Sequence, residues 1–395
     1  MLKSEGLINR IIEDATSGDD LGQILETLCN ALAEGGLAIL QASLAIPTLD
    51  PSLLGLNFVW WHGRGVSLEQ IPHSADAEAA YRNGLIFYLL DRGELTGRWR
   101  LDDPAVALSF PLFHELRERG ATELAMRLVG FGQRQMTLEG TALSVSTDSP
   151  VGFREGDLAV IRDVVPALAL AAYRVGLGRI VTHTLAAYLG ERTANRVLTG
   201  TIQRGDGEAI TAAVLLADLN GFTVLSERES SRSVVGWLNE HFEAMGEPVH
   251  AHGGEILKFI GDGILAIFAA DPQGRSAAAA CADALKSAVD VLTGTQALNR
   301  RRADAGEPEL TLNVVLHYGD VFYGNIGTPS RLDFTVIGRV VNEASRMEEL
   351  CKTVNRNLLM SKVFARNCSD EITTTSIGYH NLRDIGVREI FTNKR

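Results

Sequence analysis

Residues 255–268, EILKFIGDGILAIF, decide the fold of the second half of the chain. Two apolar runs flank the sequence Gly261-Asp262-Gly263, which is the composition of a tight hairpin between two buried strands. An aspartate in such a turn often serves the turn alone, because its side chain bonds to the nearby backbone. The stretch therefore predicts a β-hairpin. A functional role for Asp262 is indicated only if other chemically active side chains lie close to it in the fold.

A second aspartate is predicted to lie near this hairpin. Residues 212–216 are apolar and β-friendly, and they lead into ADLNGFT at 217–223, so a buried strand carries Asp218 to its end. Two carboxylates on neighbouring strands suit a pair of magnesium ions, which bind few protein carboxylates and take other ligands from water and phosphates. Backbone N–H groups of the turn after Asp218 are expected to face phosphate oxygens.

Downstream, a strand at 310–316 precedes HYGDVFYGNIG at 317–327, and DFTVIGRVVNEASRM follows at 333–347. Gly338 separates a β-rich run from a helix on which Asn342 and Arg346 are four residues apart, hence on one face. An amide and a guanidinium on one face can orient a ribose and neutralise a transferring phosphate. The alternative is an ordinary solvated helix face.

Taken together, the ordered segments DLNGFT, KFIGDG, HYGDVFYGNIG and TVIGRVVNEASR closely resemble class III adenylate and guanylate cyclases over about residues 205–390. The resemblance implies a ferredoxin-like α/β sandwich. It also implies metal binding by Asp218, the Leu219 backbone carbonyl and Asp262, adenine recognition by Lys258 and Thr335, substrate binding by Gly221, Phe222 and Thr223, and transition-state stabilisation by Asn342 and Arg346.

The same resemblance favours ATP over GTP. Lys258 donates and Thr335 can accept, which complements adenine N1 and its amino group, whereas guanine presents the reverse pattern. The sequence departs from the family at Arg339, where Asp or Asn is frequent. Arg383 is the candidate for a triphosphate-binding residue that is often lysine in the family, and arginine keeps the charge with a different geometry.

The implied activity is conversion of ATP to 3′,5′-cyclic AMP and pyrophosphate with two Mg²⁺ or Mn²⁺ ions per active site. Because the family builds its site between two catalytic domains, one domain per chain implies a homodimer with two equivalent sites. Alternatives are a pyrimidine or guanylate cyclase, or a catalytically silent nucleotide-binding module. A diguanylate cyclase is disfavoured because residues 253–256, GGEI, only partly match its signature.

The first half is predicted to be a separate mixed α/β domain, residues 1–155. Its pattern predicts helices at 7–32, 75–90 and 110–119 and strands at 37–46, 56–61, 123–130 and 140–147, an element order that loosely resembles GAF-type sensor domains. Residues 156–204 are predicted to be a helical linker before a catalytic domain at 205–395. Apolar residues recur in this linker at spacings of three and four, which predicts either a dimer seam or a helix packed on its own domain. They are Leu158, Ile161, Val165, Leu168, Ala172 and Val175, and Pro166 inside this run predicts a kink or a weaker helix.

A small-molecule regulator of the first half is expected, and the candidate ligand-facing residues, which could equally form core, are Trp60, Trp61, His62, His73 and Tyr81. The net charge of −12 argues against nucleic acid as a partner. The four cysteines form no metal-binding spacing and are expected to be reduced. No signal peptide is expected, and the apolar run at 164–172 is too short to span a membrane. A cytoplasmic protein is expected.

Overall fold

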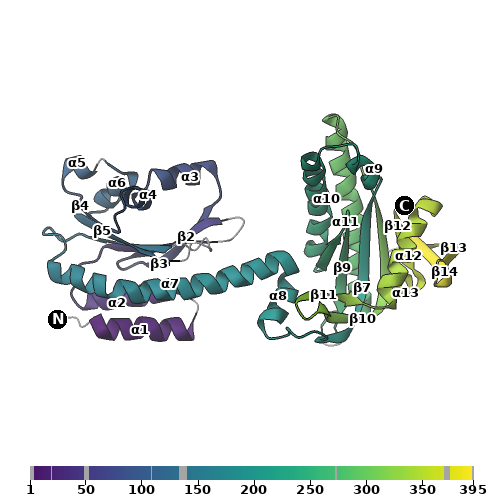
Figure 1. The fold of residues 1–395 in the computed structure, drawn as a ribbon, viewed down its shortest axis with the longest axis horizontal. Coiled ribbons are helices and arrows are strands. Elements are labelled where there is room, and N and C mark those ends of the chain that lie inside the picture. The colour runs from purple at the N-terminus through teal and green to yellow at the C-terminus, as the bar shows by residue number, and fades with distance from the viewer. Residues whose placement is uncertain are drawn as a thin grey trace. The chain divides into compact units, whose positions relative to one another are not determined.

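The computed structural model describes residues 4–18, 20–48, 53–107, 109–132, 140–271, 274–368 and 374–393. The chain divides into two compact units, Met1–Thr184 and Leu185–Arg395. Each unit combines a β-sheet with packed helices (Figure 1), so the predicted α/β class is confirmed. Residues 156–184 of the predicted linker belong to the first unit and residues 185–204 to the second.

The N-terminal unit contains a six-stranded antiparallel sheet in the order β3-β2-β1-β6-β5-β4. Its strands are β1 Gln41–Pro47, β2 Leu53–Trp61, β3 Gly65–Pro72, β4 Thr96–Arg100, β5 Glu123–Gly130 and β6 Gly140–Thr147. Helices lie on both faces of this sheet (Figure 1). On one face are α1 Ser4–Ser17, α2 Leu21–Glu34 and the first part of α7 Glu155–Leu189; on the other are α3 Ala75–Arg82, α4 Leu85–Asp91, α5 Pro104–Ala107 and α6 Pro111–Glu118.

The apolar stripe of α7 packs inside this unit. Ile161, Val165, Leu168, Ala172 and Val175 are buried in one core with α1, α2 and the sheet, and Leu158 packs against that core. The structure therefore favours a helix packed on its own domain over a free dimer seam, because these side chains already cover the sheet. Pro166 lies inside the helix without ending it.

Among the described residues, α7 is the one helix whose length and composition would allow it to cross a membrane, and half of its most apolar stretch is buried inside the structure. A core helix of a folded domain meets the same criterion, so the helix does not establish a span. Trp60, a candidate ligand-facing residue, is likewise part of the core and 1% exposed.

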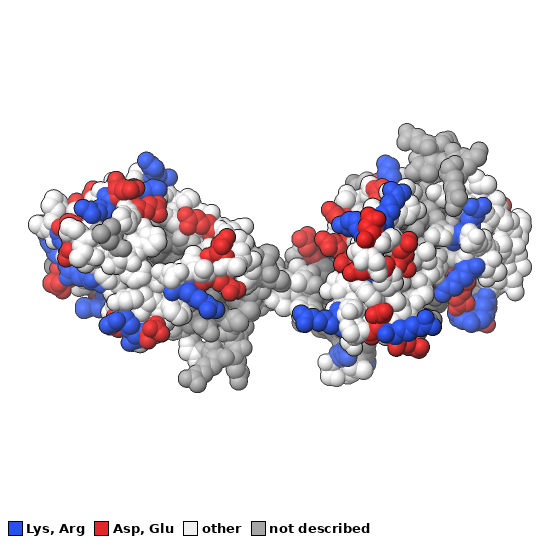
Figure 2. Space-filling view, turned by 90° about the horizontal axis from the view of Figure 1, so that it is seen from above, with Lys and Arg blue, Asp and Glu red and all other residues white. Residues whose placement is uncertain are grey.

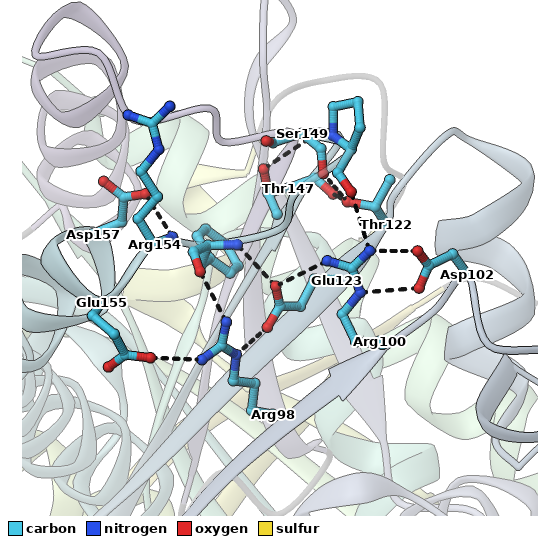
Figure 3. Close-up of polar contacts among 12 residues, drawn as sticks. Arg98, Arg100, Asp102, Thr122, Glu123, Thr147, Ser149, Arg154, Glu155 and Asp157 are labelled. Carbon is cyan, nitrogen blue, oxygen red and sulfur yellow. Dashed lines mark hydrogen bonds and ion pairs between the residues drawn. The ribbon is translucent and has the colours of Figure 1, made fainter.

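A buried carboxylate, Glu123 of β5, ties the sheet to the start of α7 (Figure 3). Its side chain is fully buried and accepts a hydrogen bond from the Phe153 backbone N–H at 2.8 Å. Arg98 of β4 pairs with Glu123 and also contacts the Phe153 carbonyl at 2.8 Å and Glu155 at 3.0 Å. Arg100 lies 3.9 Å from Glu123 on its other side. A buried charge of this kind is tolerated because it is paired and hydrogen-bonded.

Replacing Glu123 with alanine is expected to lower the free energy of unfolding of the N-terminal unit by about 2–3 kcal/mol, since the buried Phe153 N–H loses its acceptor and two arginines lose their partner. Urea unfolding of the full chain, followed by tryptophan fluorescence, measures this change. Asp102→Ala removes an exposed partner of Arg100 and should leave the transition unchanged. An unshifted transition for Glu123→Ala would mean that the network contributes little.

The C-terminal unit contains an eight-stranded sheet in the order β13-β14-β12-β10-β7-β9-β8, with β11 paired to β10. Its strands are β7 Gly207–Asn220, β8 Glu255–Ile260, β9 Gly263–Ala270, β10 Thr311–Thr328, β11 Arg331–Ile337, β12 Leu358–Ser361, β13 Thr374–Leu382 and β14 Gly386–Asn393. Its further helices are α8 Glu191–Leu198, α9 Phe222–Ser226, α10 Ser231–Ala251, α11 Ala277–Asp304, α12 Arg339–Val354 and α13 Lys362–Asn367.

The order β7-α10-β8-β9-α11-β10, with the strands adjacent as β10-β7-β9-β8, is the β-α-β-β-α-β arrangement of a ferredoxin-like sandwich. Alternate residues of β7 face opposite sides of the sheet. Ala213, Leu215 and Ala217 pack toward α10 and α11, whereas Ala212 and Val214 pack toward α12. Asp218 therefore belongs to the α12 side of the sheet.

The helix α8 is joined to the sheet of the C-terminal unit through the carboxylate of Glu255, which lies on β8. Glu255 accepts hydrogen bonds from the Thr193 backbone N–H at 3.2 Å and from its hydroxyl at 2.9 Å. The Tyr323 hydroxyl donates to the same carboxylate at 3.0 Å. The start of α8 is therefore fixed to the strand that also carries Lys258.

Charged residues of both signs cover the surface. Figure 2 shows lysines and arginines interspersed with aspartates and glutamates over the visible face of each unit.

The cysteines are reduced, as the sequence predicted. All four are free thiols, and Cys29, Cys281 and Cys351 are buried. Burial raises the pKa of the Cys351 thiol to about 12, with Glu348 adding to the effect, so this thiol stays protonated at neutral pH.

Candidate active site

The two predicted metal-binding aspartates lie together at one end of the sheet of the C-terminal unit. Asp218 is near the end of β7, and Asp262 is the second residue of the turn between the antiparallel strands β8 and β9. The turn is tight because Gly261 takes a positive φ of 61°, which an L side chain rarely adopts. Since β7 pairs with β9 as far as Ala217 and Ile264, the two aspartates are brought to adjacent positions.

Gly263 allows this close approach. A Cβ atom at residue 263 would lie 2.4 Å from the Ala217 carbonyl oxygen and 2.9 Å from an Asp218 carboxylate oxygen. The second glycine of the Gly-Asp-Gly motif is thus required first by the close approach of the Ala217 backbone carbonyl and then by the Asp218 side chain. This contact was not part of the prediction from sequence, which used the glycines only as a sign of a turn.

The two carboxylates share an electrostatically unfavourable environment. Burial, followed by the charge of Asp262 and then of Glu348, raises the pKa of Asp218 to about 6. Burial also raises the pKa of Asp262. Partly buried carboxylates that repel each other are stabilised in their charged forms by a bound cation. The pair is therefore chemically suited to hold divalent metal ions.

Three residues beside the aspartates were not predicted from the sequence. Asn313 of β10 is 2% exposed, exchanges hydrogen bonds with Asn220 at 2.8 and 2.9 Å, and donates to Glu348 of α12 at 3.1 Å. Lys352 lies one turn further along α12 and lowers the pKa of both aspartates. The spacing of Glu348 and Lys352 placed them on one helix face, but nothing local indicated that this face meets β7.

Within the described residues, no group of three or more histidine, cysteine, aspartate or glutamate side chains is arranged to hold a metal ion. The aspartate pair is therefore a sparse donor set. Such a set agrees with magnesium sites that complete their coordination with water and substrate phosphates.

After Asp218 the chain turns sharply at Gly221, from the end of β7 into the short helix α9. Leu219 is 2% exposed, with its side chain in the core beneath α10 and α11, so only its backbone is available to a ligand. Gly221 has a φ of 82° and precedes the short helix α9, in which Phe222 packs against the same core. Thr223 is in α9, but its side chain lies outside the described residues.

The predicted base-reading residues lie on β8 and β11. The Lys258 ammonium is 2.7 Å from an Asp333 carboxylate oxygen. Thr335, two residues beyond Asp333 on β11, is 5% exposed, and its hydroxyl has no hydrogen-bond partner among the described residues. Lys258 is therefore available at the surface, whereas the Thr335 hydroxyl is enclosed.

The predicted transition-state pair lies on α12, and the structure joins it to Arg383. Asn342 is exposed, and Arg346 is half-buried and 2.7 Å from Glu349. Arg383, in the turn between β13 and β14, contacts the same Glu349 at 3.0 Å. Asp384 lies 3.7 Å from each of the two arginines, so two guanidinium groups distant in sequence are held together by two carboxylates. Guanidinium groups have the geometry to bind phosphate oxygens when they exchange these partners for a substrate.

Arg339 stands where the resembling family often has Asp or Asn. It is the first residue of α12 and pairs with Glu343 at 2.8 Å. Glu343 also pairs with the buried His317 at 2.9 Å. These residues line a cavity of about 640 Å³ between α12, β12 and β14. None of the predicted active-site residues lines this cavity, so its volume does not mark the site of the proposed chemistry.

Comparison with known proteins agrees with this arrangement. Residues 207–388 match the family model described as the adenylate and guanylate cyclase catalytic domain. An adenylate cyclase of Anabaena cylindrica is 32% identical over 168 residues, covering 42% of this chain and 33% of that protein. Adenylate cyclase 1 of Rhizobium meliloti (strain 1021) is 26% identical over 287 residues, covering 70% of this chain and 42% of that protein.

The matched segments thus span a third to two fifths of the length of these curated relatives. Among solved structures, the adenylyl cyclase CyaB from P. aeruginosa is 25% identical, with a TM-score of 0.44, 48% of this chain and 97% of that chain being covered. The guanylyl cyclase Cya2 is also 25% identical, with a TM-score of 0.41, 47% of this chain and 92% of that chain being covered. From the family match and the curated adenylate cyclases, residues 207–388 of the chain form a class III adenylate and guanylate cyclase catalytic domain.

Proposed function

We propose that the chain is an adenylate cyclase that converts ATP to 3′,5′-cyclic AMP and pyrophosphate at a site shared by two copies of the chain. The observation that carries the proposal is the pairing of Asp218 with Asp262 at the end of the sheet, where burial and mutual repulsion favour a bound cation. The two curated relatives named as adenylate cyclases support the choice of ATP.

Two Mg²⁺ or Mn²⁺ ions per site fit the aspartate pair, with the Leu219 backbone carbonyl as a further ligand. When bound, such ions lower the pKa of an attacking hydroxyl and neutralise a triphosphate. The carboxylates of Asp218 and Asp262 hold this charge where the α-phosphate reacts. The backbone at Gly221 and Phe222, at the start of α9, binds the phosphates, and Thr223 is assigned to the same role from the sequence alone.

The ribose 3′-oxygen attacks the α-phosphorus, and the bond from that phosphorus to the pyrophosphate oxygen breaks. Asn342 orients the ribose, and Arg346 neutralises charge that develops around the α-phosphate. Arg383 binds the triphosphate. The contact of both arginines with Glu349 supports their acting on one substrate, because a single carboxylate already brings them together.

Lys258 donates to the adenine ring, with Thr335 assigned by the resemblance as its partner. Since one chain supplies the aspartates and its partner supplies the base and transition-state residues, the active form is a homodimer with two equivalent sites. The N-terminal unit acts as a GAF-like sensor for a small molecule. The free cysteines agree with a reducing cytoplasmic location.

A nucleotide panel tests the base preference. The full chain, incubated with ATP, GTP, CTP or UTP and either Mg²⁺ or Mn²⁺, is expected to form cyclic AMP from ATP at least about tenfold faster than any other product, since one misplaced hydrogen bond to a charged group costs that much. Mass spectrometry identifies each product. A faster cyclic GMP, CMP or UMP signal would retain the cyclase chemistry and overturn the preference for ATP.

A further inference from the structure

The cavity between α12, β12 and the β13–β14 hairpin encloses about 640 Å³, and neither predicted metal-binding aspartate lines it. Pockets that bind small molecules commonly enclose about 300–1,000 Å³. Buried side chains form its floor, since His317 and Ser361 are 5% and 7% exposed. At its mouth, Tyr379 and Val387 are 69% and 59% exposed. The cavity is therefore deep enough to hold a small molecule and open enough to admit one.

The polar floor of the cavity is organised around the Glu343 carboxylate. Its Oε1 accepts hydrogen bonds from Arg339 at 2.8 Å and from Arg388 at 3.3 Å, and its Oε2 accepts one from His317 at 2.9 Å. The Tyr318 backbone N–H donates to His317 Nδ1 at 2.8 Å, so the imidazole carries its proton on Nε2 and is neutral. Burial favours the neutral form too, because it lowers the pKa of His317.

The lining of the cavity has an excess of positive charge. Its three cationic residues face two carboxylates, and the five are Arg339, Lys362, Arg388, Glu343 and Glu389. Glu343 is shared by both arginines, whereas Glu389 pairs with Lys362 at 2.6 Å. A guanidinium has several N–H donors, and each arginine gives one of them to Glu343. A local positive excess in a chain with a net charge of −12 favours an anionic ligand at this point.

The mouth of the cavity adds an apolar surface to this charged floor. Tyr379, Val363 and Val387 line the cavity and are all exposed. Pockets for organic ligands combine apolar and aromatic walls with a few polar groups that fix the orientation of the ligand. A bare inorganic anion would leave the apolar surface uncovered. The lining is therefore suited to an organic anion that carries an aromatic or aliphatic body.

The walls of the cavity belong to elements that also carry residues of the proposed active site. Arg339 and Glu343 lie in the first two turns of α12, and Arg346 lies further along the same helix. Arg388 lies on β14, which is joined to β13 by the turn that holds Arg383. A ligand that binds Arg339 and Arg388 together therefore contacts both elements. Such a ligand biases their relative position, which is the requirement for coupling between two sites.

We propose that this cavity is a regulatory site for a small organic anion, whose carboxylate or similar group binds Arg339 and Arg388 and whose apolar body packs against Tyr379 and Val387. Occupation of the site changes turnover because the ligand bridges α12 and β14. The binding site is independent of the proposed adenylate cyclase function, and only its effect on turnover rests on that function.

The binding test uses 2-naphthoate as the probe and neutral 2-naphthamide as its match in shape. Titration of the full-length protein, followed by NMR of the probe, is expected to give saturable binding of 2-naphthoate with a Kd of roughly 0.1–1 mM. The amide should bind at least about tenfold more weakly, because it lacks the charge-assisted hydrogen bonds. Arg388→Ala should weaken 2-naphthoate binding by about tenfold or more. Its fold should be retained, since Glu343 keeps His317 and Arg339 as partners.

Arg301→Ala is the matched control, because Arg301 is an exposed arginine on α11, which packs on the opposite face of the sheet from α12. It changes the net charge equally and should leave the Kd unchanged. Tyr379→Ala should weaken binding by roughly threefold to tenfold, since part of the apolar wall is lost. Arg388→Lys should recover only part of the affinity, because an ammonium lacks the planar fork of donors.

The effect on turnover is measured with saturating 2-naphthoate and a range of ATP concentrations. The kcat for cyclic AMP formation is expected to change by about twofold or more in the wild-type chain and in Arg301→Ala, and to stay constant in Arg388→Ala. Binding of the probe at the active site would instead raise the KM for ATP, with the same effect in Arg388→Ala. That result would overturn the regulatory site.

Each remaining outcome bears on one part of the proposal. No binding of 2-naphthoate, equal binding of 2-naphthamide, or an unchanged Kd in Arg388→Ala would overturn the anion site. Binding at the cavity with an unchanged kcat would overturn its regulatory role. A wild-type chain that forms no cyclic AMP would overturn the proposed function and the regulatory role with it, whereas loss of binding in Arg388→Ala would still support the anion site.

Discussion

Asp218→Asn is expected to lower the rate of cyclic nucleotide formation by roughly 10³-fold or more, because the substitution removes half of the carboxylate pair that binds the metal ions. Asparagine keeps the shape of the side chain and the backbone hydrogen bonds of β7. The fold should therefore be retained. Product formation by mass spectrometry, with circular dichroism of the same sample, measures both properties.

The same variant has a second, pH-dependent effect on the metal-free protein. Because burial and Asp262 raise the pKa of Asp218 to about 6, the folded chain favours the protonated form. This contribution to stability is present below about pH 4 and is lost as the pH rises through about 6. Asp218→Asn should therefore raise the melting temperature by a few degrees at pH 8 and leave it nearly unchanged at pH 4.

Asp320→Asn is the matched control, because Asp320 is an exposed carboxylate on β10 that bonds to Thr211 at 2.8 Å, away from the aspartate pair. It should change neither activity nor the melting temperature. Adding Mn²⁺ should stabilise the wild-type chain and not Asp218→Asn. Normal turnover by Asp218→Asn would rule out metal binding by the aspartate pair.

Arg346→Ala is expected to lower turnover by roughly 10²- to 10³-fold, because a preorganised positive group is lost from the transferring phosphate. Arg346→Lys should recover only part of the rate, since a single ammonium cannot replace the planar guanidinium. The exposed Arg366 on α13 supplies a control, and its replacement by alanine should leave the rate unchanged.

Mixing two inactive variants tests whether the site is shared. In a heterodimer of Asp218→Asn and Arg346→Ala chains, one site carries both defects and the other carries none. Co-expression at equal levels should therefore restore about a quarter of wild-type activity, since half of the dimers are mixed and each has one intact site. If each chain held a complete site, co-expression would restore nothing, and the shared-site proposal would be contradicted.

In the C-terminal unit, the sequence predicted those elements that are specified by a few neighbouring residues, such as a glycine-containing turn or a continuous apolar run. The Gly261-Asp262-Gly263 turn specified the hairpin, and the apolar run before Asp218 specified the strand that carries it, so the approach of the two aspartates followed from neighbouring strands. The helix after Gly338 was equally clear from its pattern. In the N-terminal unit, the predicted strands at 123–130 and 140–147 have the bounds of β5 and β6.

Long-range contacts were not predictable from the sequence. The contribution of Glu348 and Lys352 depends on α12 packing across β7 and β10, which no local pattern encodes. The Asp333–Lys258 pair joins strands 75 residues apart. Two elements were also missed, since β3 and β4 are edge strands of the N-terminal sheet and much of their sequence is exposed, which weakens the apolar alternation on which strand prediction depends.

The apolar spacing of α7 did not determine what the helix packs against. Its apolar spacing was compatible with a dimer seam and with packing on its own domain, and only the structure distinguishes the two by placing the stripe in the N-terminal core. Pro166 predicted a kink or a weaker helix, yet the helix continues for 35 residues. Tertiary packing stabilises helices beyond their local propensity, which accounts for this difference.

The most direct test of the central claim is the product balance of the wild-type chain. Purified full-length protein is incubated with ATP and Mn²⁺, and cyclic AMP and pyrophosphate are quantified in the same sample. The two-carboxylate cyclase account predicts equal molar amounts of both products, with formation abolished by EDTA. ADP with phosphate, AMP with pyrophosphate in the absence of cyclic AMP, or no turnover at all would contradict it.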